Sequence, residues 1–204
     1  SRLMRILIMG ASGFIGCHLI KTLLKGKVQI WAHSRHRQTS SHEQVTWFQD
    51  FQALEGVDAI DAVINLAGAS IGKPWTKSYK KVLWSSRIDT TETMIAWLKT
   101  LKTSPKVLIN ASAVGYYGTD ENTHFDESSP ADPNSSFASR LCQTWERAAA
   151  KAQSIDGCRV VLMRFGVVLG RDGGMISRMW WPFKLGLGCR IGDGSQMMSW
   201  IHID

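Results

Sequence analysis

Short apolar runs alternate along the chain with stretches whose apolar residues recur at helical spacing. The apolar runs predict buried strands at residues 3–9, 28–32, 45–48, 59–66, 106–111 and 159–163. The helical spacing predicts helices over residues 14–25, 77–102 and 137–152. Because strands and helices alternate and the strands are almost entirely apolar, we expect a doubly wound α/β fold. Its mostly parallel sheet of about six or seven strands should be covered by helices on both faces.

Length and composition favour one ordinary globular domain. The chain has 204 residues, enough for one sizeable core and short for two, so a single domain is expected over residues 1–204. Apolar residues make up 44% of the chain and charged residues 20%, which is typical of a soluble protein. No stretch approaches the roughly 18 apolar residues of a membrane span, and the first apolar run is too short for a secretory signal. We expect a cytoplasmic protein with no membrane partner.

Charge and cysteine content narrow the choice of ligand. The net charge is +7, but the Lys and Arg residues are spread along the chain, which argues against a nucleic-acid partner. A small ligand that carries phosphate is a better use for a few of these charges. The four cysteines form no CxxC pair, so the sequence predicts neither a disulfide framework nor a metal site.

A glycine pattern follows the first strand and opens the first predicted helix. Gly10, Gly13 and Gly16 form GxxGxxG. Gly10 allows a tight turn, Gly13 lets a pyrophosphate approach the backbone, and Gly16 lets the helix lie close to the strand. The free N–H groups at the helix start attract the phosphates. The predicted cofactor-binding residues of this segment are Gly10, Ser12, Gly13, Phe14, Ile15 and Gly16.

The end of the second strand indicates which dinucleotide is preferred. A dinucleotide site that takes NAD usually has a carboxylate there, which accepts a hydrogen bond from the ribose 2′-hydroxyl. The chain has no Asp or Glu between Trp31 and His42, and instead offers Ser34 and Arg35, with Arg37 nearby. A hydroxyl and a guanidinium can bind a 2′-phosphate. The sequence therefore predicts NADP as the cofactor in preference to NAD.

Several segments spread over nearly the whole chain resemble one family. They are residues 65–68, 86–91, 111–118, 145–146, 164–170, 182–188, 192–196 and 199–204. Together with GxxGxxG they resemble the atypical extended short-chain dehydrogenases, the epimerase family or nucleoside-diphosphate-sugar epimerase-like branch. The resemblance implies a Rossmann strand order. It also implies that Leu66, Ala67, Gly68 and Arg87 contact the cofactor, that Val167 does so near the nicotinamide, and that Asp50 lies near the adenine.

The resemblance also exposes a gap in the expected catalytic residues. Active short-chain dehydrogenases pair a Ser or Thr with a Tyr and a Lys one helical turn apart. Ser112 matches the Ser, but Phe137 and Leu141 stand at the expected Tyr and Lys positions, and neither can exchange a proton. Three interpretations stay open. Catalysis is lost, or another acid serves, with Tyr116 or Tyr117 as donor and Arg164 as a nearby cation, or the alignment is shifted by a residue or two.

The function is accordingly left between two classes. The first is an NADP-dependent oxidoreductase or epimerase-like enzyme that takes a small-molecule substrate such as a sugar nucleotide. The second is a non-catalytic NADP-binding regulatory or interaction protein. The carboxylates Asp126, Glu127 and Glu146 are dispersed, and we expect solvated or structural roles for them. The resemblance further implies that a C-terminal substrate lobe is largely absent from these residues, which would expose apolar surface and favour a homo-oligomer.

Overall fold

A seven-stranded sheet organises the part of the chain that the computed structural model describes. The described residues are 2–40, 42–113, 126, 128–165, 189–191, 196–198 and 201–203. The strands of this sheet are β1 (Met4–Met9), β2 (Val28–His33), β3 (Val45–Phe48), β4 (Ala62–Asn65), β5 (Val107–Ala113), β6 (Arg159–Phe165) and β9 (Ile201–Ile203). The helices are α1 (Phe14–Leu23), α2 (Lys77–Leu98) and α3 (Phe137–Ala150), with 3₁₀ turns η1 (Phe51–Leu54) and η3 (Lys151–Ser154). A separate pair is formed by β7 (Cys189–Ile191) and β8 (Gln196–Met198).

The strand order places the carboxyl ends of six parallel strands at one edge. The order is β3-β2-β1-β4-β5-β6-β9, with β1 through β6 paired in parallel and β9 antiparallel to β6. The chain therefore winds outward from β1 in one direction and then outward from β4 in the other. Ligands in such sheets bind at the carboxyl edge beside this change of direction. The predicted doubly wound fold and Rossmann order are confirmed.

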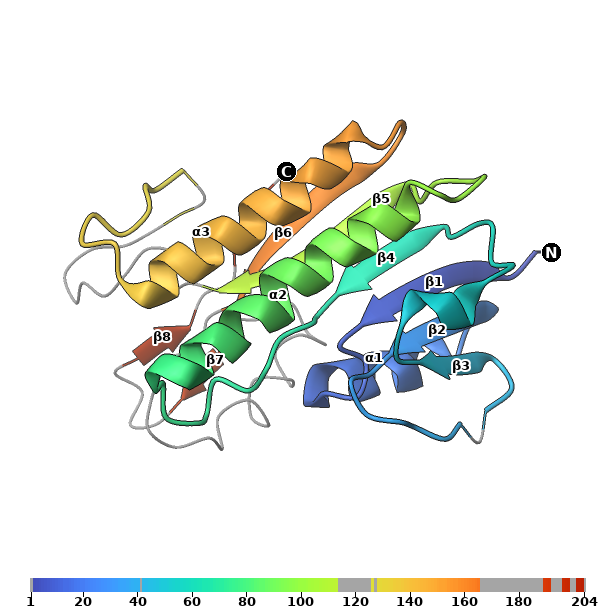
Figure 1. Cartoon of the computed structure of the whole chain (residues 1–204), viewed down its shortest axis with the longest axis horizontal. Coiled ribbons are helices and arrows are strands. Elements are labelled where there is room, and N and C mark those ends of the chain that lie inside the picture. Colours follow the sequence, from blue (N-terminus) through green and yellow to red (C-terminus); the bar gives the residue numbers. More distant parts are fainter. Residues whose placement is uncertain are drawn as a thin grey trace.

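Helices cover both faces of the sheet because the strand residues alternate between them. In β1, Ile6 and Ile8 pack into the cluster that includes Ile20 of α1. Leu7 and Met9 point the other way and pack with Met94, Ile95 and Leu98 of α2. Figure 1 shows α2 and α3 running side by side over one face of the sheet. From Ile6 to Met9, β1 is thus apolar and buried on both faces, as the apolar run predicted.

The predicted elements all exist, but several of their boundaries differ from the prediction. The strand expected over residues 59–66 is shorter, because Ala59 makes only an isolated bridge to Thr103. The helix expected over residues 77–102 ends at Leu98, where Thr100 and Leu101 turn back to bond residues three positions earlier. Leu101 is nevertheless buried, so its apolar character extended the helical pattern past the helix end. Strand β9 was not predicted.

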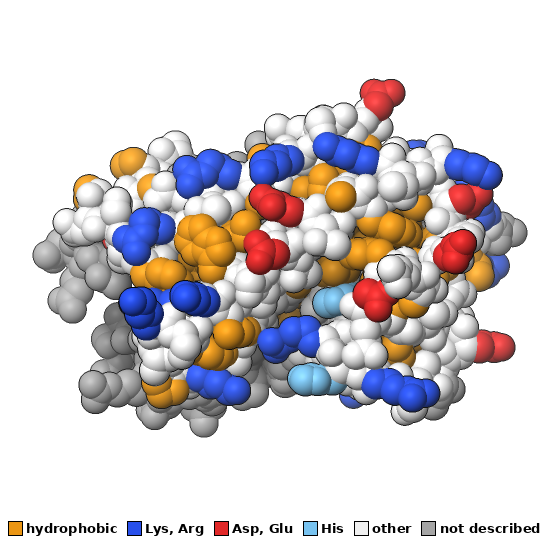
Figure 2. Space-filling model, in the orientation of Figure 1, with side chains coloured by type: hydrophobic (Ala, Val, Ile, Leu, Met, Phe, Trp, Pro, Cys, Tyr) orange, Lys and Arg blue, Asp and Glu red, His pale blue; other side chains and the backbone are white. Residues whose placement is uncertain are grey.

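Charged side chains are mixed on the face that α2 and α3 form. Figure 2 shows Lys and Arg side chains spread over this face, with Asp and Glu between them and apolar patches exposed among them. Within the described residues no group of three or more His, Cys, Asp or Glu side chains is arranged to hold a metal ion. None of the described helices is long and apolar enough to span a membrane.

Candidate functional site

The glycine turn sits at the carboxyl end of β1, against the end of β4. Gly10 has a φ of +67°, and a Cβ there would lie 2.5 Å from the Leu66 carbonyl oxygen. Gly16 is constrained by its neighbours in the same way, since its Cβ would lie 2.5 Å from the Ala11 carbonyl oxygen. Glycine at both positions is therefore required by the turn and by the close approach of α1 to it. The roles predicted for Gly10 and Gly16 within the fold match this geometry.

Gly13 differs from its two neighbours in the motif. A Cβ on Gly13 would meet nothing closer than the Gly10 carbonyl oxygen at 3.5 Å, so packing inside the chain does not demand glycine there. Gly13 is the N-cap residue of α1, and no side chain caps this helix. The N–H groups of Phe14, Ile15 and Gly16, in the first turn, have no partner within the helix. An open, uncapped helix start fits a pyrophosphate, which accepts hydrogen bonds from such groups.

Two serine hydroxyls meet beside this helix start. Ser34 Oγ donates to Ser12 Oγ at 2.9 Å and accepts from the His36 N–H at 3.2 Å. Ser34 is only 2% exposed, whereas Ser12 and Arg35 are exposed. The single proton of the Ser34 hydroxyl is used inside the protein, and the Ser12 hydroxyl keeps its own proton for an external acceptor. Of the predicted cofactor-binding residues in these two segments, Ser12 and Arg35 are thus exposed and Ser34 is buried behind Ser12.

His33, at the end of β2, is joined to the glycine turn by two hydrogen bonds. Its carbonyl oxygen accepts from the Ala11 N–H at 2.8 Å, and its Nδ1 accepts from the Gly10 N–H at 3.5 Å. The ring lies edge-on to Phe48, with 5.5 Å between centroids. Burial lowers the pKa of His33, a backbone hydrogen bond with Gln49 opposes this shift, and the charge of Arg35 adds to it. No motif in the sequence singles out His33.

The loop after β4 has most of its N–H groups engaged inside the protein. The Leu66 N–H bonds Met9, the Ala67 N–H bonds the Asn65 side chain, and the Ala69 N–H bonds Ser86. With most of its N–H groups occupied, the loop has its carbonyl oxygens as hydrogen-bond acceptors. Hydroxyl groups of a ribose are suited to donate to such carbonyls.

Arg87 lies directly on this loop. Its guanidinium donates to the carbonyls of Ala69 and Leu83 at 3.2 Å each and sits 5.4 Å from the centre of the Trp145 ring. A Cβ on Gly68 would lie 2.7 Å from Arg87 Cζ, so glycine is needed at that position for the arginine to fit. Burial lowers the pKa of Arg87. The predicted cofactor residues Leu66, Ala67, Gly68 and Arg87 are therefore brought together at the carboxyl edge.

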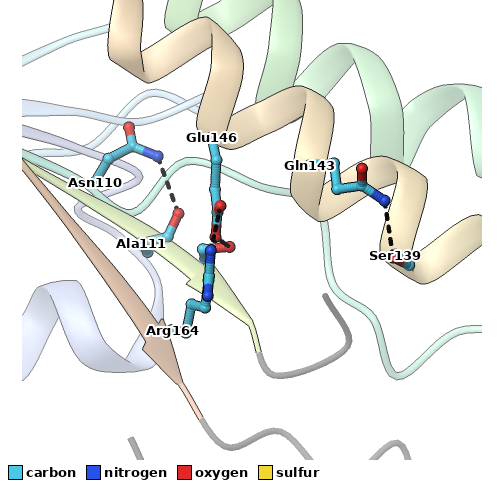
Figure 3. A network of polar contacts seen from close by, with 7 residues as sticks. Asn110, Ala111, Ser139, Gln143, Glu146 and Arg164 are labelled. Carbon is cyan, nitrogen blue, oxygen red and sulfur yellow. Dashed lines mark hydrogen bonds and ion pairs between the residues drawn. The ribbon is translucent and has the colours of Figure 1, made fainter. Parts of the chain in front are cut away.

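Buried polar side chains join the ends of β5 and β6 to α3. Arg164 and Glu146 form a two-pronged ion pair, with Nε to Oε1 at 2.7 Å and Nη2 to Oε2 at 2.9 Å (Figure 3). Ser112 Oγ donates to the same Glu146 Oε1 at 2.7 Å. Ser112 is 3% exposed, Arg164 4% and Glu146 7%. The Ser112 hydroxyl thus donates to Glu146, and the Arg164 guanidinium forms an ion pair with the same carboxylate.

Cys142 lies one helical turn before Glu146 on α3. Burial, followed by the nearby Glu146 carboxylate, raises the pKa of the Cys142 thiol to about 11. Such a thiol stays protonated and unreactive at neutral pH. Cys142 and Cys158 are free and buried, and Cys17 is free and half-buried.

Phe137 and Leu141, which stand where the resemblance implies a Tyr–Lys pair, lie in apolar surroundings. Phe137 packs edge-on to Trp75 and tilted to Trp84, with Lys80 Nζ 5.1 Å from its ring centre. Leu141 is buried with Ala69 and Ala111. Neither side chain can give or take a proton, so these two positions supply no acid or base.

Some predicted site residues lie elsewhere. Asp50 is exposed at the end of β3, and its carboxylate caps η1 by accepting from the Gln52 N–H at 3.0 Å. Tyr116, Tyr117 and Val167 lie outside the described residues. Glu146 was expected to be structural or solvated. It is structural and buried, and its partners Ser112 and Arg164 come from two other elements.

The chain is similar to known proteins in sequence and in fold. The sequence model of the NAD dependent epimerase/dehydratase family matches residues 6–204. An epimerase family protein of Staphylococcus saprophyticus is 42% identical over 201 residues, which cover 97% of this chain and 66% of that protein. The chain thus spans slightly less than two thirds of that relative.

Two solved structures share the fold. The human epimerase family protein SDR39U1, solved with NADPH, superposes with a TM-score of 0.70 at 33% identity, covering 95% of this chain and 64% of that one. UDP-glucuronic acid 4-epimerase from Bacillus cereus, solved with NAD, has a TM-score of 0.65 at 20% identity, covering 80% of this chain and 56% of that one.

Proposed function

Because the chain belongs to the NAD dependent epimerase/dehydratase family, we propose that it binds NADP at the glycine turn. We further propose that the intact protein is an NADP-dependent oxidoreductase or sugar-nucleotide epimerase-like enzyme. The observation that carries the NADP preference is the pairing of Ser34 with Ser12 beside the exposed Arg35, with no carboxylate at the end of β2. Support also comes from the human relative, which was solved with NADPH.

Each part of the site has a separate task in this proposal. The uncapped start of α1 binds the pyrophosphate through Gly13, Phe14 and Ile15. Ser12 donates to the 2′-phosphate and Arg35 pairs with it, while Ser34 orients the Ser12 hydroxyl. Ser12 and Arg35 would bind NAD less well, because a 2′-hydroxyl offers no charge to the guanidinium.

The loop after β4 and the exposed end of β3 complete the proposed cofactor contacts. Leu66, Ala67 and Gly68 present carbonyls to a ribose, and Arg87 keeps their loop in place through the Ala69 carbonyl. We keep Asp50 and Val167 as proposed contacts on the adenine and nicotinamide sides. A bound nicotinamide would supply hydride transfer, and the protein would have to supply the proton.

The proposed proton chemistry is limited by what Ser112 and Arg164 already do. The Ser112 hydroxyl donates its hydrogen bond to Glu146, so it can accept a hydrogen bond from a ligand but cannot donate one. Arg164 is neutralised by Glu146 and is a poor source of positive charge for lowering a tyrosine pKa. If the intact protein is catalytic, Tyr116 or Tyr117 is our proposed donor, with Ser112 as an orienting acceptor.

A second candidate function is favoured by the same observations. Phe137 and Leu141 are packed apolar side chains, and both polar groups at the ends of β5 and β6 are engaged internally. A protein that binds NADP without turning it over, as a regulatory or interaction module, needs none of these groups to be free. Two assays of the full-length protein separate the two functions: NADPH oxidation with carbonyl substrates, and conversion of sugar nucleotides to their epimers, which consumes no cofactor. Tight binding without turnover favours the second, and turnover that survives both Tyr116→Phe and Tyr117→Phe excludes those donors.

The 2′-phosphate site is tested by two substitutions measured with both cofactors. Arg35→Ala should weaken NADPH binding by about ten- to a hundredfold, since a hydrogen bond to a charged group contributes about 1.5–3 kcal/mol. Ser12→Ala should weaken it by a smaller factor, and neither change should affect NADH by more than about twofold. Lys99→Ala, an exposed charge at the end of α2, is the matched control. An Arg35→Ala protein that keeps its preference for NADPH would exclude this site.

A further inference from the structure

The imidazole of His33 has a place in the site that neither the glycine motif nor the serine–arginine pair explains. His33 is the last residue of β2 and directly precedes Ser34. Its two hydrogen bonds reach Gly10 and Ala11 of the glycine turn, one through the ring and one through the backbone. The neighbouring bond from Ser34 to Ser12 is the third link between the same two segments. The end of β2 and the glycine turn are thereby joined at three successive positions.

We propose that His33 is a positioning residue for the dinucleotide, and that its neutral imidazole holds the glycine turn in its binding conformation. This inference rests on the proposed dinucleotide site. The ring acts through Gly10: the N–H of Gly10 needs an acceptor, and Nδ1 supplies it only while that nitrogen carries no proton. A protonated Nδ1 is a donor and faces another donor, so protonation removes this link and loosens the turn.

The surroundings of the ring favour the neutral form at neutral pH. Burial lowers the pKa of His33, and the nearby positive charge of Arg35 acts in the same direction. Against the ring lie the uncharged Phe48 and the backbone of Gln49, whose hydrogen bond raises the pKa. Asp50 follows in the chain, but its carboxylate is directed to the Gln52 N–H. Of the described charged groups, Arg35 is the one that acts on His33.

The sign of the pH effect follows from this lowered pKa. The unfolded chain takes up a proton near the ordinary value of 6.5, before the folded chain does. The native state, and with it the turn, therefore loses stability as the pH falls below 6.5 toward the lower folded value. Dinucleotide affinity should fall at lower pH still, where His33 of the folded protein itself takes up a proton.

Two substitutions separate the hydrogen bond from the titration. His33→Asn keeps an acceptor, because Asn Oδ1 can take the place of Nδ1, but it does not titrate. His33→Leu keeps apolar contact with Phe48 and has no acceptor. His42→Asn, an exposed histidine in the segment before β3, is the matched control.

The test is calorimetric titration with the oxidised cofactors NADP⁺ and NAD⁺ at about pH 7.5 and then at successively lower pH, for as long as the protein remains folded. The unmodified protein should lose about three- to tenfold more affinity for NAD⁺ on acidification than His33→Asn does, as expected for one hydrogen bond. The difference should be smaller for NADP⁺, because an imidazolium also attracts the 2′-phosphate. Titration of that phosphate is common to both proteins and cancels in the comparison. His33→Leu should bind weakly at every pH, and His42→Asn should follow the unmodified protein.

Two results would overturn the inference. One is the same pH response in the unmodified protein and in His33→Asn. The other is a ¹⁵N spectrum of the unmodified protein at neutral pH in which the His33 Nδ1 carries a proton, which needs no variant to fold. Failure of both cofactors to bind at any pH overturns the proposed function as well. Equal binding of NADP⁺ and NAD⁺ with an intact pH difference overturns only the NADP preference.

Discussion

At the residue scale, the site depends on the glycines, which lack a Cβ, and on hydroxyl groups that already donate a hydrogen bond inside the protein. Gly10 and Gly16 leave no room for a Cβ, whereas Gly13 leaves room that the chain itself does not use. The hydroxyls of Ser34 and Ser112 both donate their hydrogen bond to a partner inside the protein. Such details decide which groups can still bind a ligand. Roles for these glycines and serines could be predicted from the sequence. The hydrogen bonds of the serines could not, because they join positions far apart in the chain.

Gly10→Ala should be strongly destabilising because it combines two costs. A non-glycine residue at φ +67° is strained by about 1–3 kcal/mol, and its Cβ would overlap the backbone of Leu66 and Ala67. We expect a total loss of roughly 2–6 kcal/mol in the free energy of unfolding, measured by urea denaturation.

Gly56→Ala is the matched control for this prediction. Gly56 has a φ of +90°, but a Cβ there would meet nothing within 4 Å. It should therefore show the cost of the backbone conformation alone, about 1–3 kcal/mol. Equal losses in the two variants would show that the contact between the glycine turn and the end of β4 contributes nothing.

At the element scale, α3 is more than the amphipathic helix that its apolar spacing predicts. Phe137, Leu141 and Trp145 recur in it at intervals of four residues, and the structure buries Leu141 and Trp145. It also buries Glu146, beside Cys142 and one turn after it, where it meets Arg164 and Ser112. A carboxylate adjoining an apolar stripe is the signal that could have indicated a buried partner. The identity of the partner could not be read, because Arg164 lies in β6 and Ser112 in β5.

The positions of element ends show a similar limit of sequence patterns. Leu101 continues the apolar spacing of α2, yet the helix ends at Leu98 and Leu101 is buried from a turn. Periodicity reports which side chains are buried and does not report the backbone that carries them there. This is why every predicted element exists while several boundaries differ.

Removing the Glu146 carboxylate should destabilise the protein far more than removing a surface one. Glu146→Gln removes the carboxylate that pairs with the buried Arg164 guanidinium, at an expected cost of about 3–5 kcal/mol. Glu92→Gln, which removes the exposed pair with Lys151, should cost less than about 1 kcal/mol. Thermal and urea unfolding of both variants gives the comparison.

A double variant identifies the cause of that loss. Glu146→Met with Arg164→Met replaces the pair with apolar side chains of similar length and should recover much of the stability. If Glu146→Gln is no more harmful than Glu92→Gln, the buried ion pair does not hold α3 to the ends of β5 and β6.

At the scale of the whole molecule, the glycine turn, the end of β2 and the loop after β4 meet at one edge of the sheet. This edge adjoins the point between β1 and β4 where the strand order changes direction. The fold, the strand order and the family could all be anticipated from sequence, because the apolar runs and the glycine motif lie in short continuous segments. The chemistry of the substrate could not, because the glycine motif and the apolar runs concern only the dinucleotide and the fold.

The central claim is that this edge binds NADP in preference to NAD, and the ratio of the two affinities tests it most directly. Titration of the unmodified chain with NADPH and with NADH, followed by fluorescence at one pH and one salt concentration, gives this ratio. The account predicts tighter binding of NADPH by about tenfold or more, since the 2′-phosphate adds charge-assisted hydrogen bonds to Ser12 and Arg35. Equal affinities, or tighter binding of NADH, would contradict it.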